Sequence, residues 1–369
     1  MKFSAVKESI LPYIQYANSF TSPKNLNTHL QNIYLEVEDN TLIMKATNYQ
    51  IGFKASANIQ SVAETGVITV SGKTLMDVIK EMPDGSLIDF YYDGSRLNIK
   101  SGKSSFKLST ADPKGFPVIS DIPAEYYIKL DSEALINLLK RTYFCISNES
   151  QKIEYTGAQF NVYGNCLEMF ATGLQRVAIA STLFDKEFAD EFTINIPKKT
   201  VQEIIRILEN CGPVEIETDR KQVSFKTENI TVYSKLIDKF VKGVNRLFEN
   251  EYPVKAKLER KKFIEAAKRV SAISSNDTPG LMMNFSDGVL SMASLETEYG
   301  QGSEVIDNIS FSGDNFDIIL NAKHVTEILA NIDTDFFTFE MIDRRSPVLI
   351  TPDTERYRYL VVPISIDRF

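Results

Sequence analysis

Basic residues recur in this sequence at a spacing that brings two cations to one face of a helix. Lys73 and Lys80 are separated by about two helical turns, and Lys199 and Arg206 repeat that separation. Cations arranged in this way can contact the phosphates of a nucleic acid without reading its bases. The alternative is an ordinary solvated helix face, on which acidic residues such as Asp77 form ion pairs.

The same chemistry is repeated on other segments with helical periodicity. Lys323 occupies the first position of such a pair, whereas Ala330 stands at the second, and the segment 259–269 is the richest in basic residues. A basic bias shared by similar segments favours a surface for a polyanion. Its candidate residues are Lys73, Lys80, Lys140, Arg141, Lys198, Lys199, Arg206, Lys261, Lys262, Lys268, Arg269 and Lys323.

A phosphate-binding loop is the second chemistry that the residue types suggest, but its spacing is wrong. The segment from Gly66 to Thr74 reads Gly-Val-Ile-Thr-Val-Ser-Gly-Lys-Thr, with one residue too many between the glycines. The intervening residues also predict a β-strand, whereas a phosphate cradle needs a turn. We therefore expect no nucleotide site here.

Residues that could support catalysis or hold a metal are sparse. The two histidines, His29 and His324, lie in no recognisable nucleophile motif and have no ligand spacing. The three cysteines, Cys145, Cys166 and Cys211, also lack metal-ligand spacing and are expected to be small core residues in a reducing cytosol. The sequence predicts no enzyme, no metal site and no cofactor.

Composition places the chain among ordinary globular proteins. Its 369 residues are 43% hydrophobic and 24% charged, with a net charge of −8. No run approaches the roughly 18 apolar residues of a membrane span, and no signal-peptide pattern opens the chain. The net charge argues against nucleic-acid binding by the whole surface, but it allows binding where positive charge is concentrated.

An internal repeat positions these basic residues. Similar segments begin at Ile68, Ile194 and Ile318, roughly 125 residues apart, which indicates a domain present three times. Each segment starts with a β-branched strand pattern and continues with apolar residues at i, i+3, i+4 and i+7, the stripe of an amphipathic helix. The stripes are Leu75, Val78, Ile79 and Met82; Val201, Ile204, Ile205 and Leu208; and Val325, Ile328, Leu329 and Ile332.

Hairpins recur beside these helices. Turn residues at 38–40, 163–165 and 286–288 separate alternating strands, and further hairpins are expected at Asp93-Gly94 and Asp219-Arg220. Each repeat also begins with a strand that leads into a second helix. We predict an α+β fold of three tandem similar domains, 1–122, 123–248 and 249–369, each with two helices packed on mostly antiparallel sheets. The expected linkers are 117–124 and 248–253, and Pro12 inside the first predicted helix weakens the expectation that this helix is regular.

Charge is distributed unevenly between the predicted helices and the rest of the chain. The six predicted helices span 6–17, 71–82, 131–142, 197–209, 259–269 and 321–331. Together they carry 14 Lys and Arg and 10 Asp and Glu, so they are basic while the remainder of the chain is strongly acidic. This partition strengthens the interpretation of a polyanion-binding surface formed by helices.

The whole pattern resembles the bacterial DNA sliding clamps, the beta subunits of DNA polymerase III. The most specific segments are Met1-Lys-Phe, the run 100–109, Leu236-Ile-Asp and Tyr359-Leu-Val-Val-Pro. The resemblance implies the DNA clamp fold, in which the chain is half of a closed ring formed as a head-to-tail homodimer. It implies sequence-independent binding of duplex DNA on the basic helices, with Lys24 as a further DNA-facing residue. It also implies a cytoplasmic, nucleoid-associated processivity factor without catalytic activity or attachment to a membrane.

The resemblance further implies a pocket for short linear peptides between the second and third domains. Its partners would be the clamp loader, the catalytic subunit of DNA polymerase III, and other polymerases and repair proteins. Matching positions are Tyr155, Thr172, Gly173, Arg176, Val177, Arg246, Leu247, Asn321, His324, Ser346, Leu360, Val361, Val362, Pro363 and Ile364. The family's Thr-Asp-Gly-His-Arg-Leu run reads Thr172-Gly-Leu-Gln-Arg-Val here, Lys242 replaces a proline, and the C-terminus is longer. Ile153 and Glu154 replace the family's DNA-contacting tyrosines.

For the dimer seam, the resemblance pairs the first domain with the third domain of another copy. Lys103, Phe106 and Leu108 would face Ile273, Glu298 and Glu304, and Ser274 replaces an apolar residue there. Two other classes remain open at this point. One is a structural or adhesion array of three β-rich domains without DNA binding, and the other is an enzyme whose site forms between domains.

Overall fold

The computed structural model describes residues 1–243, 245–274, 279–298, 300–354 and 356–364. These residues include all six helices expected from the repeat. Their observed bounds are α1 Lys7–Ser19, α2 Gly72–Lys80, α3 Ser132–Thr142, α4 Lys198–Ile207, α6 Arg260–Val270 and α7 Ala322–Ala330. The described residues also form a short helix that the sequence did not predict, α5 Asn245–Phe248. Within the observed bounds the six helices keep all 14 basic residues and only 6 acidic ones.

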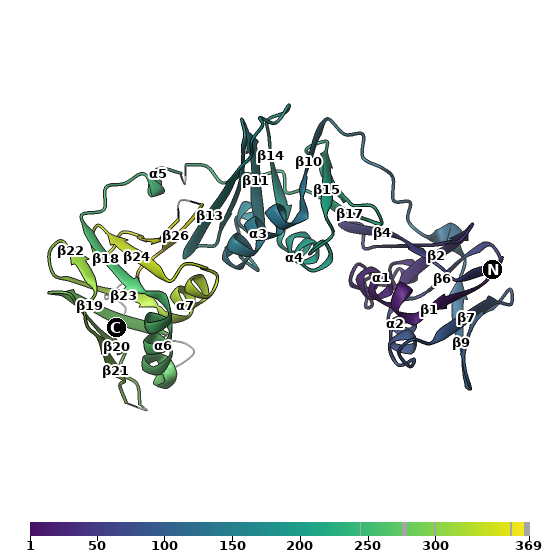
Figure 1. Cartoon of the computed structure of the whole chain (residues 1–369), viewed down its shortest axis with the longest axis horizontal. Helices are drawn as coiled ribbons and strands as arrows, with labels where there is room; N and C mark the ends of the chain where they lie inside the picture. Colours follow the sequence, from purple (N-terminus) through teal and green to yellow (C-terminus); the bar gives the residue numbers. More distant parts are fainter. Residues whose placement is uncertain (244, 275–278, 299, 355, 365–369) are drawn as a thin grey trace. The chain divides into compact units, whose positions relative to one another are not determined.

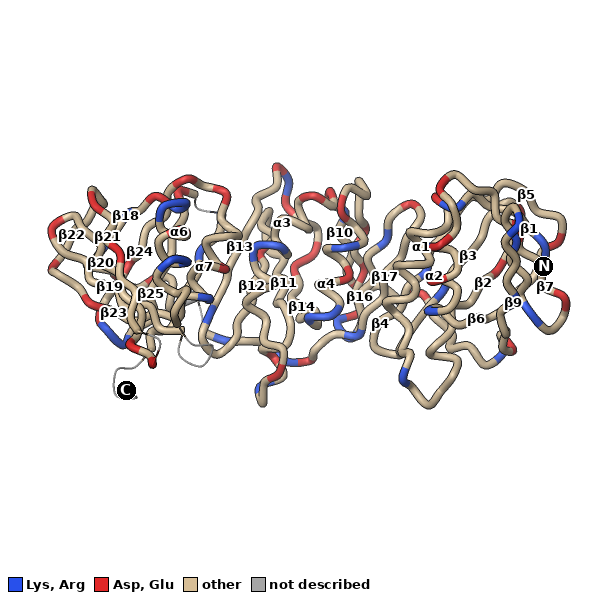
Figure 2. The backbone as a smooth tube through the Cα atoms, turned by 90° about the horizontal axis from the view of Figure 1, so that it is seen from below, with Lys and Arg blue, Asp and Glu red and all other residues tan. Residues whose placement is uncertain are grey.

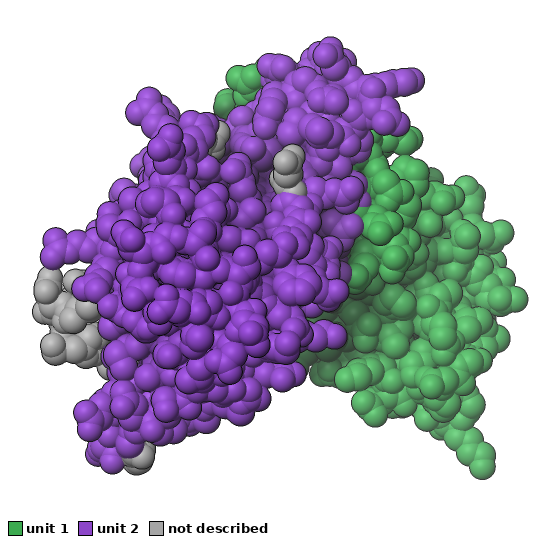
Figure 3. Space-filling view, turned by 60° about the vertical axis from the view of Figure 1, so that its left-hand side comes forward, with its two compact units in different colours: residues 1–133, 206–236 green, residues 134–205, 237–369 purple. Residues whose placement is uncertain are grey.

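The chain divides into two compact units (Figure 3), unit 1 with residues 1–133 and 206–236, and unit 2 with residues 134–205 and 237–369. Unit 1 contains a 13-stranded sheet in the order β10-β15-β16-β17-β4-β3-β2-β6-β9-β8-β7-β1-β5. Its strands are β1 Lys2–Val6, β2 Asn32–Glu38, β3 Thr41–Thr47, β4 Ile51–Asn58, β5 Ser61–Glu64, β6 Gly66–Ser71, β7 Leu87–Tyr92, β8 Arg96–Ser101, β9 Ser104–Ala111, β10 Tyr126–Asp131, β15 Pro213–Thr218, β16 Gln222–Lys226 and β17 Ile230–Lys235.

Unit 2 contains two sheets, and most of their strands are labelled in Figure 1. A nine-stranded sheet has the order β14-β11-β12-β13-β26-β25-β24-β18-β22, and a four-stranded sheet has the order β21-β20-β19-β23. The strands are β11 Gly157–Tyr163, β12 Cys166–Thr172, β13 Arg176–Leu183, β14 Phe192–Pro197, β18 Val254–Glu259, β19 Gly280–Ser286, β20 Val289–Ser294, β21 Ser303–Ile306, β22 Ser310–Ser312, β23 Phe316–Asn321, β24 Phe336–Met341, β25 Val348–Pro352 and β26 Tyr357–Val361.

Antiparallel pairing continues from one repeat into the next. In unit 1, β17 of the second repeat pairs with β4 of the first, with Val232 opposite Phe53. In unit 2, β13 of the second repeat pairs with β26 of the third, with Ala178 opposite Tyr359. Each junction therefore satisfies the backbone groups of two edge strands that would otherwise be exposed.

The hairpins expected from the turn residues are confirmed. Asp39 and Asp287 adopt positive φ between β2 and β3 and between β19 and β20, and Gly164 does so between β11 and β12. Gly94 and Arg220 also adopt positive φ in the two further hairpins. Gly and the short polar residue Asp tolerate this conformation, which is why most of these turns could be recognised in the sequence, whereas at Arg220 the signal was the preceding Asp219.

The helix stripes are largely buried, as predicted. Leu75, Val201 and Val325 are fully covered, whereas Val78 and Ile205 are half-buried at the edges of their stripes. Pro12 lies inside α1, which extends from Lys7 to Ser19.

The expected linker 248–253 is not simply an exposed connection. Phe248 ends α5 and is 5% exposed, and Tyr252 is 7% exposed. Both pack in a hydrophobic cluster with Val177, Leu349 and Leu360. We call residues 245–253 the strap, because they lie on the nine-stranded sheet and are anchored there by these two aromatic rings.

Candidate nucleic-acid, peptide and dimer interfaces

Several of the basic helix residues are exposed and make no ion pair among the described residues. Lys73, Lys80, Lys199, Lys261 and Lys268 are of this kind. Lys323 and Lys24 are exposed as well. Figure 2 marks basic segments on α3, α4 and α6 of unit 2. Cations left uncompensated on helices are suited to phosphate contacts, which are electrostatic and independent of base sequence.

Arg141 has a different environment from these lysines. Its guanidinium donates to the Asn331 carbonyl and, at 2.5 Å, to Asp333 Oδ2. It also lies 4.4 Å from the centre of the Tyr357 ring, and the Tyr357 hydroxyl donates to the other Asp333 oxygen. Burial raises the pKa of Tyr357 to about 12, so the hydroxyl stays protonated as a donor. Arg141 thus joins α3 to the third repeat, and its donors are engaged within unit 2.

Lys198 and Arg206 are also held by the protein. Lys198 Nζ donates to the Ile146 carbonyl at 2.6 Å, and burial together with Arg176 lowers its pKa. Arg206 donates to Ser19 Oγ at 2.6 Å and lies 5.1 Å from the centre of the Tyr16 ring. Two further candidate cations pair with carboxylates, Lys262 with Glu259 at 2.6 Å and Arg269 with Glu304. Lys140 is half-buried.

The expected peptide pocket surrounds a hydrophobic cluster on the nine-stranded sheet. Phe170, Val177 and Leu360 belong to this cluster. Apolar side chains that remain exposed beside it are Leu174 at 75%, Leu247 at 36% and Val362 at 38%. The backbone N–H of Val362 donates to the Gln175 carbonyl at 3.0 Å, so the end of β26 is tied to the turn before Arg176. Exposed apolar groups over a buried apolar floor are suited to binding a short peptide.

Arg176 is the charged centre of this region. Its guanidinium donates to Glu327 Oε2 of α7 and, at 2.9 Å, to the Phe144 carbonyl. The Arg176 side chain is 17% exposed, whereas that of Glu327 is 49% exposed. Glu327 was absent from our sequence-based pocket. The pairing could not be predicted because Glu327 is far from Arg176 in the chain. The available signal was its position one turn after His324 on the same helix.

His324 lies beside this ion pair at the start of α7. The Asn321 side chain caps the helix by accepting from the backbone N–H groups of Lys323 and His324. Burial, reinforced by Arg176, lowers the pKa of His324 to about 4, so the imidazole is neutral at physiological pH. A neutral ring can form part of an apolar wall without a charge that requires solvation.

The other expected pocket residues have varied positions. Val361 is fully buried in β26, and Thr172 is buried with its hydroxyl donating to the Gly173 carbonyl at 2.7 Å. Tyr155 and Ser346 are half-buried, and Arg246 is exposed on α5. Gly173, Pro363 and Ile364 are half-buried, and residues 365–369 of the longer C-terminus lie outside the described residues.

The first expected seam strand has an unpaired edge. β9 pairs with β8 from Ser104 to Ser109, and its other side meets β6 only at Thr110 and Ala111. No described strand pairs with that other side along 104–109. Phe106 on this stretch is 38% exposed, whereas Leu108 is 8% exposed and largely part of the core. Lys103 is exposed in the turn before the strand.

The seam residues of the third repeat also surround an edge strand. β21 is the terminal strand of the four-stranded sheet, and its Val305 is 55% exposed. Glu304 accepts from Arg269 Nε at 2.9 Å and from its NH2 group at 2.5 Å, which lowers the pKa of Glu304. Glu298 is exposed, and Ile273 is half-buried.

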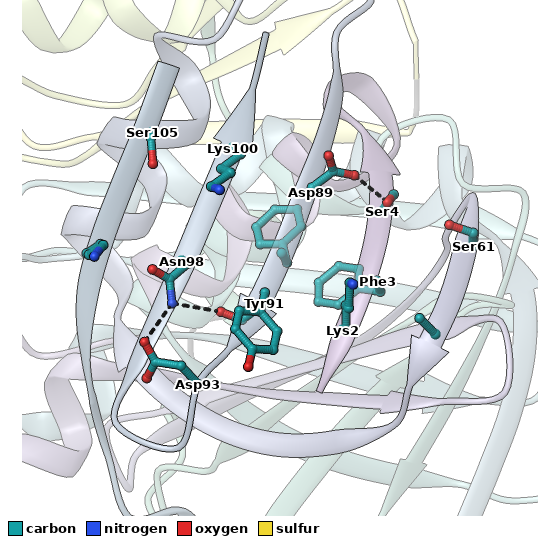
Figure 4. Close-up of a pocket in the computed structure, with 13 residues that line it drawn as sticks. Lys2, Phe3, Ser4, Ser61, Asp89, Tyr91, Asp93, Asn98, Lys100 and Ser105 are labelled. Atoms are coloured by element: carbon teal, nitrogen blue, oxygen red, sulfur yellow. Dashed lines mark hydrogen bonds between the residues drawn. The ribbon is translucent and has the colours of Figure 1, made fainter. Parts of the chain in front are cut away.

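A hollow of about 830 Å³ lies on unit 1 and is shown in Figure 4. Strand register places Lys2 beside Tyr91, and Asp89 beside Lys100. The two carboxylates that line the hollow, Asp89 and Asp93, both accept hydrogen bonds. Ser4 donates to Asp89 at 2.6 Å, and Asn98 donates to Asp93 at 2.9 Å. The hydrogen bond from Asn98 and those from the backbone N–H groups of Arg96 and Ser95 lower the pKa of Asp93 to about 2. Among the described residues, the lining contains no histidine or cysteine.

The described residues contain no group of three or more His, Cys, Asp or Glu that could hold a metal ion. Cys145 and Cys166 are buried as expected, and Cys211 is half-buried. Burial raises the pKa of the Cys145 thiol to about 12, so it is a core group rather than a nucleophile. In the described part of the chain, no helix combines the length and apolar character needed to cross a bilayer.

Three repeats, each with helices carrying basic residues and antiparallel sheets that continue between repeats, define the three-domain DNA clamp fold. Family models for the DNA polymerase III beta subunit match nearly the whole chain, the N-terminal domain at 1–120, the central domain at 129–242 and the C-terminal domain at 245–365. The chain belongs to this family, the bacterial beta sliding clamps, which are non-catalytic processivity factors.

Individual relatives match along their full length. The beta sliding clamp of Vibrio cholerae is 24% identical over 368 residues, covering 99% of this chain and 100% of that protein. That of Pseudomonas aeruginosa is 26% identical over 368 residues with the same coverage. A crystal structure of the Pseudomonas aeruginosa protein bound to griselimycin has a TM-score of 0.94 at 25% identity, covering 99% of this chain and 100% of that chain. Family membership excludes the adhesion-array and enzyme alternatives.

Proposed function

We propose that two copies of this chain close head to tail into a ring around duplex DNA, and that each copy tethers partner proteins through its peptide pocket. The observation that carries the ring is a pair of unpaired strand edges, one on the first domain and one on the third. An exposed edge is a site for pairing with another chain unless something covers it. Pairing β9 of one copy with β21 of another would remove both edges at once.

Charge and apolar exposure on the two edges are complementary. The β9 side presents Lys103 and the exposed ring of Phe106, whereas the β21 side presents Glu298 and the exposed side chain of Val305. Glu304 is already paired with Arg269, so Glu298 is the carboxylate that remains for Lys103. Because Ser274 replaces an apolar residue of the family pattern, the apolar contribution to this joint would be modest.

The exposed helix lysines supply the DNA-binding surface. Lys73, Lys80, Lys199, Lys261 and Lys268 combine exposure with the absence of a described ion-pair partner. Lys323 and Lys24 are further exposed lysines that we assign to this surface. We assign Arg141, Lys198 and Arg206 mainly to holding the helices in place, because their donors bind protein groups. A ring with a non-specific cationic lining can move along DNA while remaining topologically linked to it.

The peptide pocket supplies the tether. Its floor is Val177 and Leu360, its exposed apolar rim includes Leu247 and Val362, and Arg176 lies at one side. Short segments with aliphatic and aromatic anchors would bind here, from the clamp loader, the catalytic subunit of DNA polymerase III and other polymerases and repair proteins. The protein would act in the cytoplasm, at the nucleoid. We propose the domain boundaries 1–122, 123–248 and 249–369.

Sedimentation equilibrium tests the dimer seam with a charge reversal and its compensation. Lys103→Glu should weaken dimerisation, because it places a carboxylate opposite Glu298 across the joint. Adding Glu298→Lys to the same chain should restore much of the lost affinity. The control Lys100→Glu changes a neighbouring lysine of β8 and should leave the dimer intact. A wild-type chain that is strictly monomeric at micromolar concentration would overturn the ring.

A further inference from the structure

A second hollow, of about 440 Å³, lies between the strap and strands β24, β25 and β26. Phe248, Asn250 and Tyr252 of the strap form one side, and Glu340, Leu349, Thr351, Thr354 and Arg358 form the other. Phe339 packs on Phe263 of α6, with ring centres 5.4 Å apart. Side chains alternate along a strand, so Glu340 and the hollow lie on the face away from that helix.

Among the described residues, Arg358 is the only cation that lines this hollow, and it is half-buried. Its guanidinium carbon lies 5.3 Å from the centre of the Phe248 ring, and its NH1 group donates to the Phe248 carbonyl at a long 3.4 Å. No carboxylate of the described residues pairs with it. A guanidinium has five N–H donors, so most of its capacity remains for a ligand.

The lining carboxylate is already compensated. Glu340 accepts from Lys255 Nζ at 2.8 Å and from Thr351 Oγ1 at 2.6 Å. The hollow therefore combines one cation that lacks a carboxylate partner with apolar surface from Phe248 and Leu349. A ligand with one negative charge and an apolar body matches both features. A doubly charged phosphate would lack a second cation here, and the planar guanidinium fits a carboxylate in a bidentate manner.

We propose that this hollow binds a small monocarboxylate with an apolar body, its carboxylate on Arg358 and its body against Phe248 and Leu349. The strap connects this site to the peptide pocket. Phe248 belongs to the hydrophobic cluster with Val177 and Leu360, and its neighbours Arg246 and Leu247 are pocket residues. A ligand that holds Phe248 in place stabilises the strap, so peptide affinity rises on binding. This coupling rests on the proposed peptide-tethering function and must act in both directions.

Direct binding tests the site independently of any peptide. Phenylacetate is titrated into the full-length protein by calorimetry, with phenylacetamide as a neutral compound of nearly the same shape. We expect a Kd on the order of 1 mM for the acid and at least about tenfold weaker binding of the amide. Arg358→Gln should weaken acid binding to the level of the amide, and Arg358→Lys should retain part of it. Arg356→Gln removes an exposed arginine outside the hollow and should change nothing.

Two results would overturn the site: equal binding of acid and amide, or acid binding that Arg358→Gln leaves unchanged. A thermal melt of each variant separates misfolding from loss of the ligand, and Arg358→Lys serves if Arg358→Gln does not fold. For the coupling, a fluorescent peptide with a clamp-binding motif should bind about threefold more tightly in saturating phenylacetate, and Arg358→Gln should abolish that gain. Acid binding without a gain refutes the coupling alone. Absence of peptide binding refutes the proposed tether and leaves the ligand site standing.

Discussion

At the residue scale, basic side chains of similar appearance in the sequence have different roles in the structure. Lys199 is exposed on α4, whereas Arg141 on α3 bonds to Asn331 and Asp333 and stacks on Tyr357. Helical spacing identifies which face a residue occupies, but it does not reveal a partner almost two hundred positions away. This is why the basic surface could be predicted as a set and not residue by residue.

Replacing Arg141 and Lys199 one at a time distinguishes a structural role from a role in DNA binding. Arg141→Ala should lower the free energy of unfolding by about 2–4 kcal/mol, because it removes two hydrogen bonds to or from charged groups. Lys199→Ala should change it by no more than about 0.5 kcal/mol. In the salt dependence of DNA binding, Lys199→Ala should reduce the slope of log K against log salt by about 1. Urea titration and binding isotherms at several salt concentrations provide the measurements. Equal stability losses for both variants would contradict the assignment.

His324 makes a second residue-scale prediction, for the pH dependence of stability. Its folded pKa of about 4 lies below its ordinary value of 6.5, so the unfolded chain takes up the proton first as pH falls. The contribution of neutral His324 is therefore present above about pH 6.5 and lost as pH falls towards 4. His324→Gln should flatten the loss of thermal stability across that window. Parallel melting curves for variant and wild type would show that His324 does not titrate in this way.

At the element scale, the end of β26 separates buried residues from an exposed one. Tyr359, Leu360 and Val361 are at most 1% exposed and pair with β13 and β25, whereas Val362 is 38% exposed. Truncation after Tyr359 would remove two core side chains, each contributing about 2–5 kcal/mol, and would disrupt the junction between repeats. Truncation after Val361 keeps both of these core side chains and so leaves that junction intact.

Truncation after Val361 therefore tests the pocket cleanly. It removes the exposed Val362 and the backbone N–H that bonds to Gln175. Peptide affinity should fall at least about tenfold, because an apolar contact and a fixed edge of the pocket are both lost. Fluorescence anisotropy measures the peptide, and sedimentation measures the dimer, which should persist. Unchanged peptide affinity would place the pocket elsewhere.

The elements themselves were the most predictable part of the structure. The three apolar stripes predicted α2, α4 and α7 to within a few residues, because the same stripe recurs in the other two repeats. Turn residues that adopt positive φ predicted the hairpins. The strap was missed because Pro253 and its charged neighbours resemble a solvated linker. Its packing depends on where Phe248 and Tyr252 meet Leu349 and Leu360, and such contacts have no local periodicity.

At the scale of the whole molecule, the repeat predicted three domains, and the clamp fold confirms that number. The junctions within the chain were not predictable from the repeat, because they pair strands of different repeats. β17 pairs with β4, and β13 pairs with β26. The same physics argues for a junction between chains. Residues 104–109 of β9 and the outer side of β21 are two edges that pairing among the described strands leaves open, and closure between two chains would pair them as the junctions within the chain are paired.

Retention on circular DNA tests the ring most directly. The protein is loaded by a bacterial clamp loader onto nicked circular duplex, separated from free protein, and followed before and after the DNA is cut once with a restriction enzyme. A topologically linked ring should remain on circular DNA and leave within minutes of linearisation. Both results should hold at salt concentrations that disrupt ordinary phosphate contacts. Equal retention on circular and linear DNA would contradict the encircling ring.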